Sequence, residues 1–149
     1  MKNYKGLSCR HIATIFLVLM YAGCSFPHDA SDAFNRAKSD RLLVGASKNS
    51  PFVVDSVPSP RGTEVDLLRQ FAEEQGLLIE FEFANETSLV RKLTEGQLDV
   101  LIGGFDKETL WKQQVGLTMP YDGVHVVLIR KGENRLLYEL EKSFKRLHK

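Results

Sequence analysis

The sequence predicts an α/β fold with a mostly parallel sheet and helices on both of its faces. Short apolar runs typical of buried strands alternate with stretches of helical spacing, and this alternation favours parallel strands. Glycines follow these runs at positions where the chain is expected to turn. The chain has 149 residues, of which 43% are hydrophobic and 26% charged, enough for one domain with a core.

The folded part is expected to begin at Arg41 and to alternate between strands and helices. The expected elements are a strand over 41–46, a helix over 64–75, a strand over 77–83, a short helix after Asn85, a strand over 98–102, a helix over 107–115 and a strand over 124–130. Gly76 is a natural C-cap for the first helix, and Asn85 is a natural N-cap for the second. Proline-rich residues 47–61 are expected to form a loop.

A further helix is predicted at the C-terminal end, in the stretch GENRLLYELEKSFKRL. Leu137, Leu140, Phe144 and Leu147 recur there at helical spacing. We expect this apolar stripe to pack on the core of the lobe, because such a stripe usually faces a core; the alternative is a membrane-surface helix.

The N-terminal segment has the features of an export signal. Basic residues precede an apolar run over 12–22, which is too short to span a bilayer. The run ends in Tyr21-Ala22-Gly23-Cys24, which resembles the bacterial lipobox, although Tyr21 departs from the usual leucine. We therefore predict a lipoprotein-type signal peptide over 1–23, a lipidated Cys24 and a polar tether over 24–40. The alternatives are an ordinary signal peptide with a chance cysteine, or an uncleaved N-terminal anchor.

Nucleic-acid binding and catalysis both lack support in this sequence. The formal net charge of +1 offers no basic face for a nucleic acid. There is no nucleophile elbow, metal-binding histidine pair or phosphate loop, so we expect neither enzyme activity, nor a cofactor, nor a metal. His125 stands alone on a predicted strand, where a histidine is far more often a surface or core residue than a general base.

The strongest candidate for a binding site follows the strand over 98–102. Gly103 and Gly104 end that strand and Asp106 opens the next predicted helix, an arrangement at which open α/β sheets bind ligands. The loop after the first strand is expected to lie beside it. The candidate ligand-binding residues are Ser47, Asn49, Phe52, Gly103, Gly104, Asp106 and Trp111. Structural roles compete with this interpretation: Asp106 as an N-cap, Trp111 as packing and the glycines as a tight turn.

A series of short motifs gives the chain a family resemblance. In order they are Val44-Gly45, Pro51-Phe52, Gly62-x-x-Val65-Asp66-Leu67, Leu93-x-x-Gly96-x-x-Asp99-Val100, Pro120-Tyr121 and Arg130-Lys131-Gly132. Together they resemble the family 3 extracellular solute-binding proteins, the polar amino acid receptors of ABC importers. The resemblance implies a periplasmic-binding-protein-like fold, in which two lobes close on a ligand. Here residues 41–149 are expected to form a single lobe, with the C-terminal helix following directly where the family crosses into its second lobe.

Two positions in the candidate site depart from the family pattern. The resemblance places a serine or threonine where Asp106 stands, and a carboxylate-binding arginine where Trp111 stands. An indole cannot replace the charged, two-pronged contact of a guanidinium, and Asp106 repels a carboxylate. If these residues face a ligand, they favour a cationic or aromatic-stacking solute.

The resemblance and the export signal together predict a function. We expect an exported protein of the periplasm or cell envelope that binds a small polar or cationic solute without covalent chemistry. A lone lobe covers one side of a solute, so a second surface is expected from a homodimer, an ABC permease or another membrane partner. The alternative is a non-transport envelope lipoprotein that acts as an interaction or regulatory module on a membrane complex.

Overall fold

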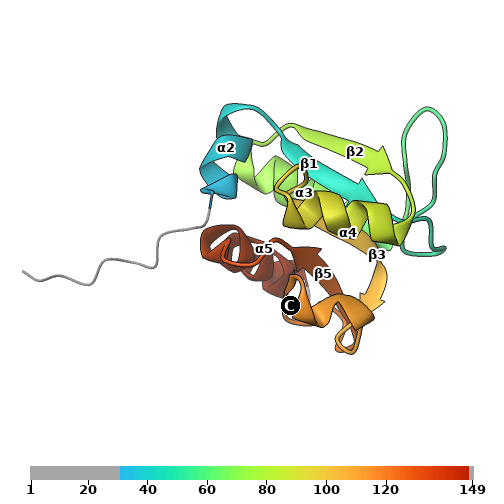
Figure 1. Ribbon diagram of the computed structural model, residues 1–149. Helices are drawn as coiled ribbons and strands as arrows, with labels where there is room; N and C mark the ends of the chain where they lie inside the picture. The colour runs from blue at the N-terminus through green and yellow to red at the C-terminus, as the bar shows by residue number, and fades with distance from the viewer. Residues whose placement is uncertain (1–30, 148–149) are drawn as a thin grey trace, which may run out of the picture.

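A five-stranded sheet runs through residues 31–147, the part of the chain that the computed structural model describes (Figure 1). The strands are β1 (Leu42–Ala46), β2 (Ile79–Phe83), β3 (Val100–Asp106), β4 (Gly116–Leu117) and β5 (His125–Ile129), in the spatial order β2-β1-β3-β5-β4. β1 pairs in parallel with β2 and β3, whereas β5 pairs antiparallel with β3 and β4. Only β5 therefore runs against the other described strands, and the predicted mostly parallel sheet is confirmed.

Helices cover both faces of this sheet, as the sequence predicts. They are α2 (Ala33–Ser39), α3 (Thr63–Gln75), α4 (Glu86–Thr94) and α5 (Asn134–Leu147), with a short 3₁₀ turn η1 (Leu110–Gln113) after β3. One apolar core joins α2, α3 and α5 to the sheet, and a second core joins α4 to its other face. The alternation of buried side chains along β3 explains this division, because Val100 and Ile102 enter the first core and Leu101 enters the second.

Two helix ends form as their local residues predict. Gly76 ends α3 in the left-handed conformation, with φ of 66°. The side chain of Asn85 accepts a hydrogen bond from Ser88 N at 2.9 Å and so caps α4. Both predictions are confirmed because each depends on residues close in sequence.

Helix α5 packs on the core of the lobe and contacts α3. Leu136, Leu140 and Phe144 are its buried apolar residues, while Leu137 is partly buried beside them. The prediction of a core-packed terminal helix is confirmed, with the buried stripe centred on Leu136 instead of Leu137.

The prediction of a tether up to Asp40 is wrong for residues 33–39, which form helix α2. Phe34 and Ala37 of this helix are buried in the first core. The buried carboxylate of Glu133 accepts hydrogen bonds from Ser31 N (3.0 Å), Ser31 Oγ (2.6 Å) and Ala33 N (3.0 Å). A carboxylate at a helix N-terminus satisfies backbone donors that otherwise lack partners, and this contact supports a helix of seven residues.

The predicted signal peptide, Cys24 and residues 24–30 of the predicted tether lie outside the described residues. Within residues 31–147, every helix is too short or too polar to cross a membrane.

Candidate functional site

The candidate site lies where β1 ends beside β3. The expectation that Gly103 and Gly104 end the second strand is wrong, because β3 continues through them to Asp106 by pairing with β5. Ser47 follows β1, and its N–H donates to Ile102 O of β3 at 2.9 Å. The connection leaving β1 forms α3 on one face of the sheet, and the connection entering β3 forms α4 on the other face. Adjacent parallel strands with connections on opposite faces define a topological switch point, the usual ligand position in open α/β sheets.

A buried carboxylate holds the glycine pair at this point. Glu64, in the first turn of α3, is fully buried. Its Oε2 accepts from Gly103 N at 2.7 Å and from Gly104 N at 2.9 Å, while its Oε1 accepts from the Tyr121 hydroxyl at 2.8 Å. These two backbone donors are therefore engaged by the protein itself.

Burial shifts the pKa values of both ionisable groups in this cluster, Glu64 and Tyr121. Burial raises the pKa of Glu64, and the hydrogen bonds from Gly104, Tyr121 and Gly103 oppose that rise. Burial and the neighbouring Glu64 carboxylate raise the pKa of Tyr121, so its hydroxyl keeps its proton and remains a donor. The cluster is a structural clamp between α3, β3 and the segment around Tyr121.

The loop after β1 closes over Gly104. Asn49 Nδ2 donates to Gly103 O at 2.8 Å. Gly104 has φ of +67°, and a Cβ there would collide with the Phe52 ring and lie 2.8 Å from Asn49 Nδ2. Only glycine adopts this positive φ without strain and leaves room for the Phe52 and Asn49 side chains. Sequence reasoning placed Ser47, Asn49, Phe52, Gly103 and Gly104 in one site, and the structure brings these five together.

The first backbone donors of α3 are engaged as well. Thr63 N donates to Pro51 O at 3.2 Å, and Glu64 N donates to Phe52 O at 3.1 Å. A helix N-terminus can attract anions only through donors that are open. This helix end is instead closed by its own loop.

The expected helix over 107–115 is wrong, and Asp106 caps no helix. Asp106 is the last residue of β3, and its Oδ1 accepts from Glu108 N at 2.7 Å in a local turn. Only the four residues of η1 are helical, and Leu110 within them is 91% exposed. Trp111 and Val115 of this segment do pack on the second core, but Leu110 faces solvent, so this packing does not stabilise a longer helix. The Asp106 carboxylate is therefore exposed at the edge of the site.

Trp111 lies on the other side of the sheet from Phe52. Its partly buried indole packs against the core on the α4 face, and its Nε1 donates to Glu86 Oε2 at 3.3 Å. Phe52 packs against the core on the α3 face. Among the predicted site residues, Trp111 is thus the one that the structure sets apart from the glycine pair.

His125 belongs to the site, although sequence reasoning set it aside. Its ring lies 4.3 Å from the Phe52 ring, centroid to centroid, and His125 pairs with Asp106 in the register of β3 and β5. Its Nδ1 lies 2.7 Å from Asp122 Oδ2. The Asp-x-x-His spacing is the sequence signal that could have indicated this turn.

Asp122 is held as a carboxylate. Burial acts to raise its pKa, but hydrogen bonds from His125 N (2.7 Å), the His125 ring and Val124 N (2.9 Å) outweigh that effect. The pKa of Asp122 is thereby lowered to about 2. The turn over 122–125 therefore fixes both the backbone and the ring of His125.

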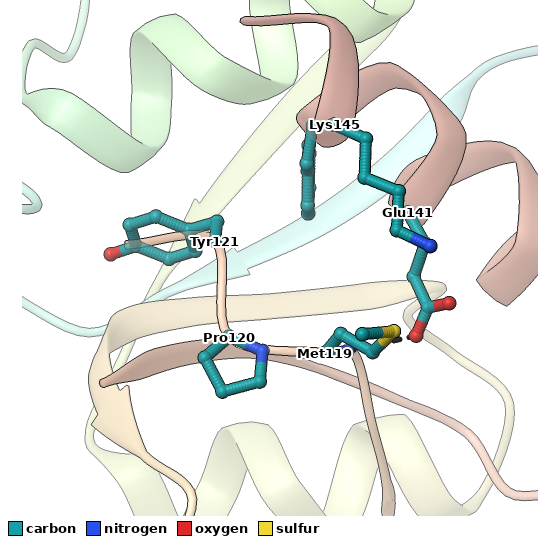
Figure 2. A pocket seen from close by; sticks show the side chains of 6 residues that line it. Met119, Pro120, Tyr121, Glu141 and Lys145 are labelled. Carbon is teal, nitrogen blue, oxygen red and sulfur yellow. Dashed lines mark hydrogen bonds between the residues drawn. The ribbon is translucent and has the colours of Figure 1, made fainter. Parts of the chain in front are cut away.

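Two open hollows adjoin these elements. One of about 580 Å³ lies between the loop after β1 and the end of β2, and it is lined by Ser47, Lys48, Asp55, Phe83, Ala84 and Asn85. The other, of about 250 Å³, lies between α5 and the segment 119–121 (Figure 2). There Met119 N donates to Glu141 Oε1 at 2.8 Å, and the Tyr121 side chain points away from Glu141. Only the first hollow shares a residue, Ser47, with the predicted site.

The kind of ligand that the site can bind depends on which of its hydrogen-bonding groups are not already engaged by the protein. The backbone donors of the glycine pair and of the α3 N-terminus are engaged, while the Asp106 carboxylate is exposed. Such a surface favours a ligand that donates hydrogen bonds or carries positive charge. Within residues 31–147, no group of histidine, cysteine and acidic side chains is arranged to hold a metal ion.

A lobe of this architecture, with its candidate site at the ends of adjacent parallel strands, is the type found in periplasmic binding proteins. The chain belongs to the bacterial extracellular solute-binding proteins, family 3, whose model matches residues 42–149. The comparison with curated proteins found no match.

Solved structures show the same fold. The arginine-bound form of domain 1 from TmArgBP is 26% identical, with a TM-score of 0.64 over 70% of this chain and 91% of that one. A mutant of the same domain is 25% identical, with a TM-score of 0.70 over 78% and 98% of the two chains. A periplasmic binding protein of high arginine specificity from Salmonella typhimurium, 14% identical, gives a TM-score of 0.63 over 71% and 92%. The described residues therefore form a single lobe of the family 3 type.

Proposed function

We propose that this protein is an exported solute-binding module that holds a small polar or cationic solute reversibly, without covalent chemistry. The proposed binding face runs from the loop over 47–52 to the segment 103–106. The observation that carries the proposal is the exposed Asp106 carboxylate beside backbone donors that Glu64 already engages. Family membership supports solute binding as the activity.

The nature of the solute follows from two substitutions in the family pattern. Trp111 stands where the resemblance implies a carboxylate-binding arginine, and its indole bonds to Glu86. Asp106 adds a negative charge at the edge of the same site. A carboxylate on the solute therefore lacks a cationic partner here, whereas an ammonium or guanidinium group finds an acceptor.

The structural relatives support binding by one lobe. Domain 1 of TmArgBP is arginine-bound as a separate domain, and it is similar to nearly the whole described lobe. Arginine carries a guanidinium group, in keeping with a cationic solute for this chain.

A second surface would complete the enclosure of the solute. Leu110 in η1 follows β3 and Val124 precedes β5, and they are 91% and 52% exposed. Exposed apolar residues beside a half-open site suit a covering partner. A second copy of the chain and an ABC permease are the proposed partners.

The membrane attachment is proposed at Cys24. Lipidation there holds the lobe in the periplasm or cell envelope without a membrane-spanning segment. Cys24→Ser is expected to release the protein from membranes, and unchanged membrane retention in fractionation would contradict the proposal.

A panel of solutes read by thermal shift tests the binding proposal. A specific solute at a concentration 100 times its dissociation constant stabilises the folded protein by about 2.7 kcal/mol. Asp106→Asn is expected to reduce that shift because it removes the charge. Asp66→Asn is the matched control, since the exposed Asp66 carboxylate lies 3.8 Å from Arg69 of the same helix.

The alternative proposal is an interaction or regulatory module that binds no solute. The exposed Leu110 and Val124 side chains favour it as well, because the same face suits a protein partner. No shift with polar amino acids, polyamines or aromatic cations, together with a membrane protein cross-linked at this face, would support this alternative and contradict solute binding.

A further inference from the structure

We infer that His125 is a solute-binding residue that, together with Asp106, selects amines or guanidines lacking a carboxylate. Its Nε2 accepts a hydrogen bond from the solute, and the Asp106 carboxylate balances the positive charge. This inference rests on the proposed function, which it makes specific in ligand class.

The orientation of the imidazole ring is fixed from two sides. Asp122 Oδ2 lies 2.7 Å from Nδ1, and Asp122 Oδ1 accepts from the His125 backbone N–H at 2.7 Å. The Phe52 ring packs at 4.3 Å in a tilted arrangement, and the Tyr121 ring lies at 6.2 Å. A ring held in this way presents its remaining nitrogen in one direction.

The Asp122 contact also defines the hydrogen-bonding role of each ring nitrogen. Asp122 is an acceptor because it stays ionised, so Nδ1 carries the proton and donates. In a neutral imidazole with a protonated Nδ1, Nε2 is an acceptor.

Nε2 of His125 keeps contact with solvent. Among residues 31–147, every buried side-chain nitrogen or oxygen has a hydrogen-bond partner. The one polar contact of the His125 ring to another described side chain is that of Nδ1 with Asp122, and the side chain is 25% exposed. Because Nε2 has no such partner, it cannot be buried, and it is available to a ligand.

The position of His125 places it beside Asp106. The two residues are directly opposite in the antiparallel pairing of β3 and β5, so their side chains leave the sheet on the same face. Opposite residues in such a pair have Cβ atoms about 4.5–5.5 Å apart, a spacing that one ammonium or guanidinium group can bridge.

The charges around this pair favour a donor-only cation. The carboxylates of Asp106, Asp122 and Glu64 and the hydroxyl of Tyr121 surround His125, and the backbone donors of the glycine pair are engaged by Glu64. A carboxylate on the solute meets repulsion here, whereas an amine or guanidine meets two acceptors.

Titration calorimetry of the full chain with agmatine and arginine tests the inference. Agmatine carries a guanidinium and an ammonium group and no carboxylate, so we expect it to bind more tightly than arginine. His125→Phe keeps the packing on Phe52 and removes the acceptor, with an expected loss of about tenfold in affinity, the value of one hydrogen bond. His125→Gln restores an acceptor and is expected to recover part of the loss.

The remaining variants separate binding from folding. Asp122→Ala removes the partner of Nδ1 and frees the ring, and it is expected to weaken agmatine binding less than His125→Phe does. Gln70→Leu, at an exposed position on α3, is the control and should bind agmatine as the wild type does. Circular dichroism shows whether each variant unfolds cooperatively.

Each outcome bears on one proposal. A folded His125→Phe protein that binds agmatine within twofold of wild type overturns the role of His125. Tighter binding of arginine than of agmatine overturns the ligand class and leaves solute binding standing. A wild-type protein that binds no solute of the panel overturns the proposed function together with this inference.

Discussion

Replacing Glu64 with alanine removes the acceptor on which three buried donors depend. Gly103 N, Gly104 N and the Tyr121 hydroxyl all donate to its carboxylate, at 2.7, 2.9 and 2.8 Å. A buried donor without an acceptor destabilises a protein by about 1–3 kcal/mol. Water entering the vacated space satisfies part of this need, so we take the lower value for each donor. The free energy of unfolding is then expected to fall by about 3 kcal/mol.

Urea unfolding followed by far-UV circular dichroism and by the fluorescence of Trp111, the only tryptophan of the chain, measures this loss. With a slope of about 1.5 kcal/mol per molar urea for a domain of this size, the midpoint moves down by about 2 M. Glu64→Gln is the matched control, because its carbonyl oxygen still accepts and its shape is the same; we expect it within about 1 kcal/mol of wild type. A Glu64→Ala protein within about 1 kcal/mol of wild type would refute the clamp.

Three further results are expected. Gly104→Ala should lower the free energy of unfolding by about 2 kcal/mol or more, because Gly104 has a positive φ and a Cβ there collides with Phe52. Gly76 has a similar φ but open space around it, so Gly76→Ala should lower the free energy of unfolding by only about 1 kcal/mol. Equal losses of the two variants in urea unfolding would contradict the close approach of Phe52 to Gly104. Burial raises the pKa of Glu64 above its ordinary 4.5. The free energy of unfolding of wild type relative to Glu64→Gln should therefore fall as pH rises from 4.5 through the raised pKa. A difference between the two proteins that is independent of pH would contradict the raised pKa. Trp111→Ala should lower the free energy of unfolding by about 2 kcal/mol, because the half-buried indole of Trp111 packs on the core of the α4 face. An unchanged urea midpoint would exclude that packing.

Local signals in the sequence predicted much of the fold. Gly76 and Asn85 act on residues within one helical turn, and the β1 and β3 strands are continuous apolar runs, so each is visible in a short window. Helix α2 escaped prediction because its seven residues are supported by Glu133, about 100 positions away. The segment 107–115 has helical residues but leaves Leu110 in solvent, and helical spacing alone did not reveal that exposure.

The candidate site was predictable in position but not in its contacts. The glycine pair and the loop after β1 mark the point where β1 and β3 stop pairing, although β3 itself continues to Asp106. The partners of that pair are distant in the chain: Glu64 lies 39 positions before Gly103 and 57 before Tyr121. No local pattern indicates that a glutamate in a helical first turn reaches these donors, so the engagement of the backbone and the place of His125 emerged only from the structure.

Glu133 joins the first described residues to the start of α5 through Ser31 and Ala33. Arg36 of α2 in turn pairs with Asp99, whose carboxylate accepts from Leu43 N of β1 at 2.9 Å. The two ends of the described chain are thus fastened to one another and, through α2, to the central strands.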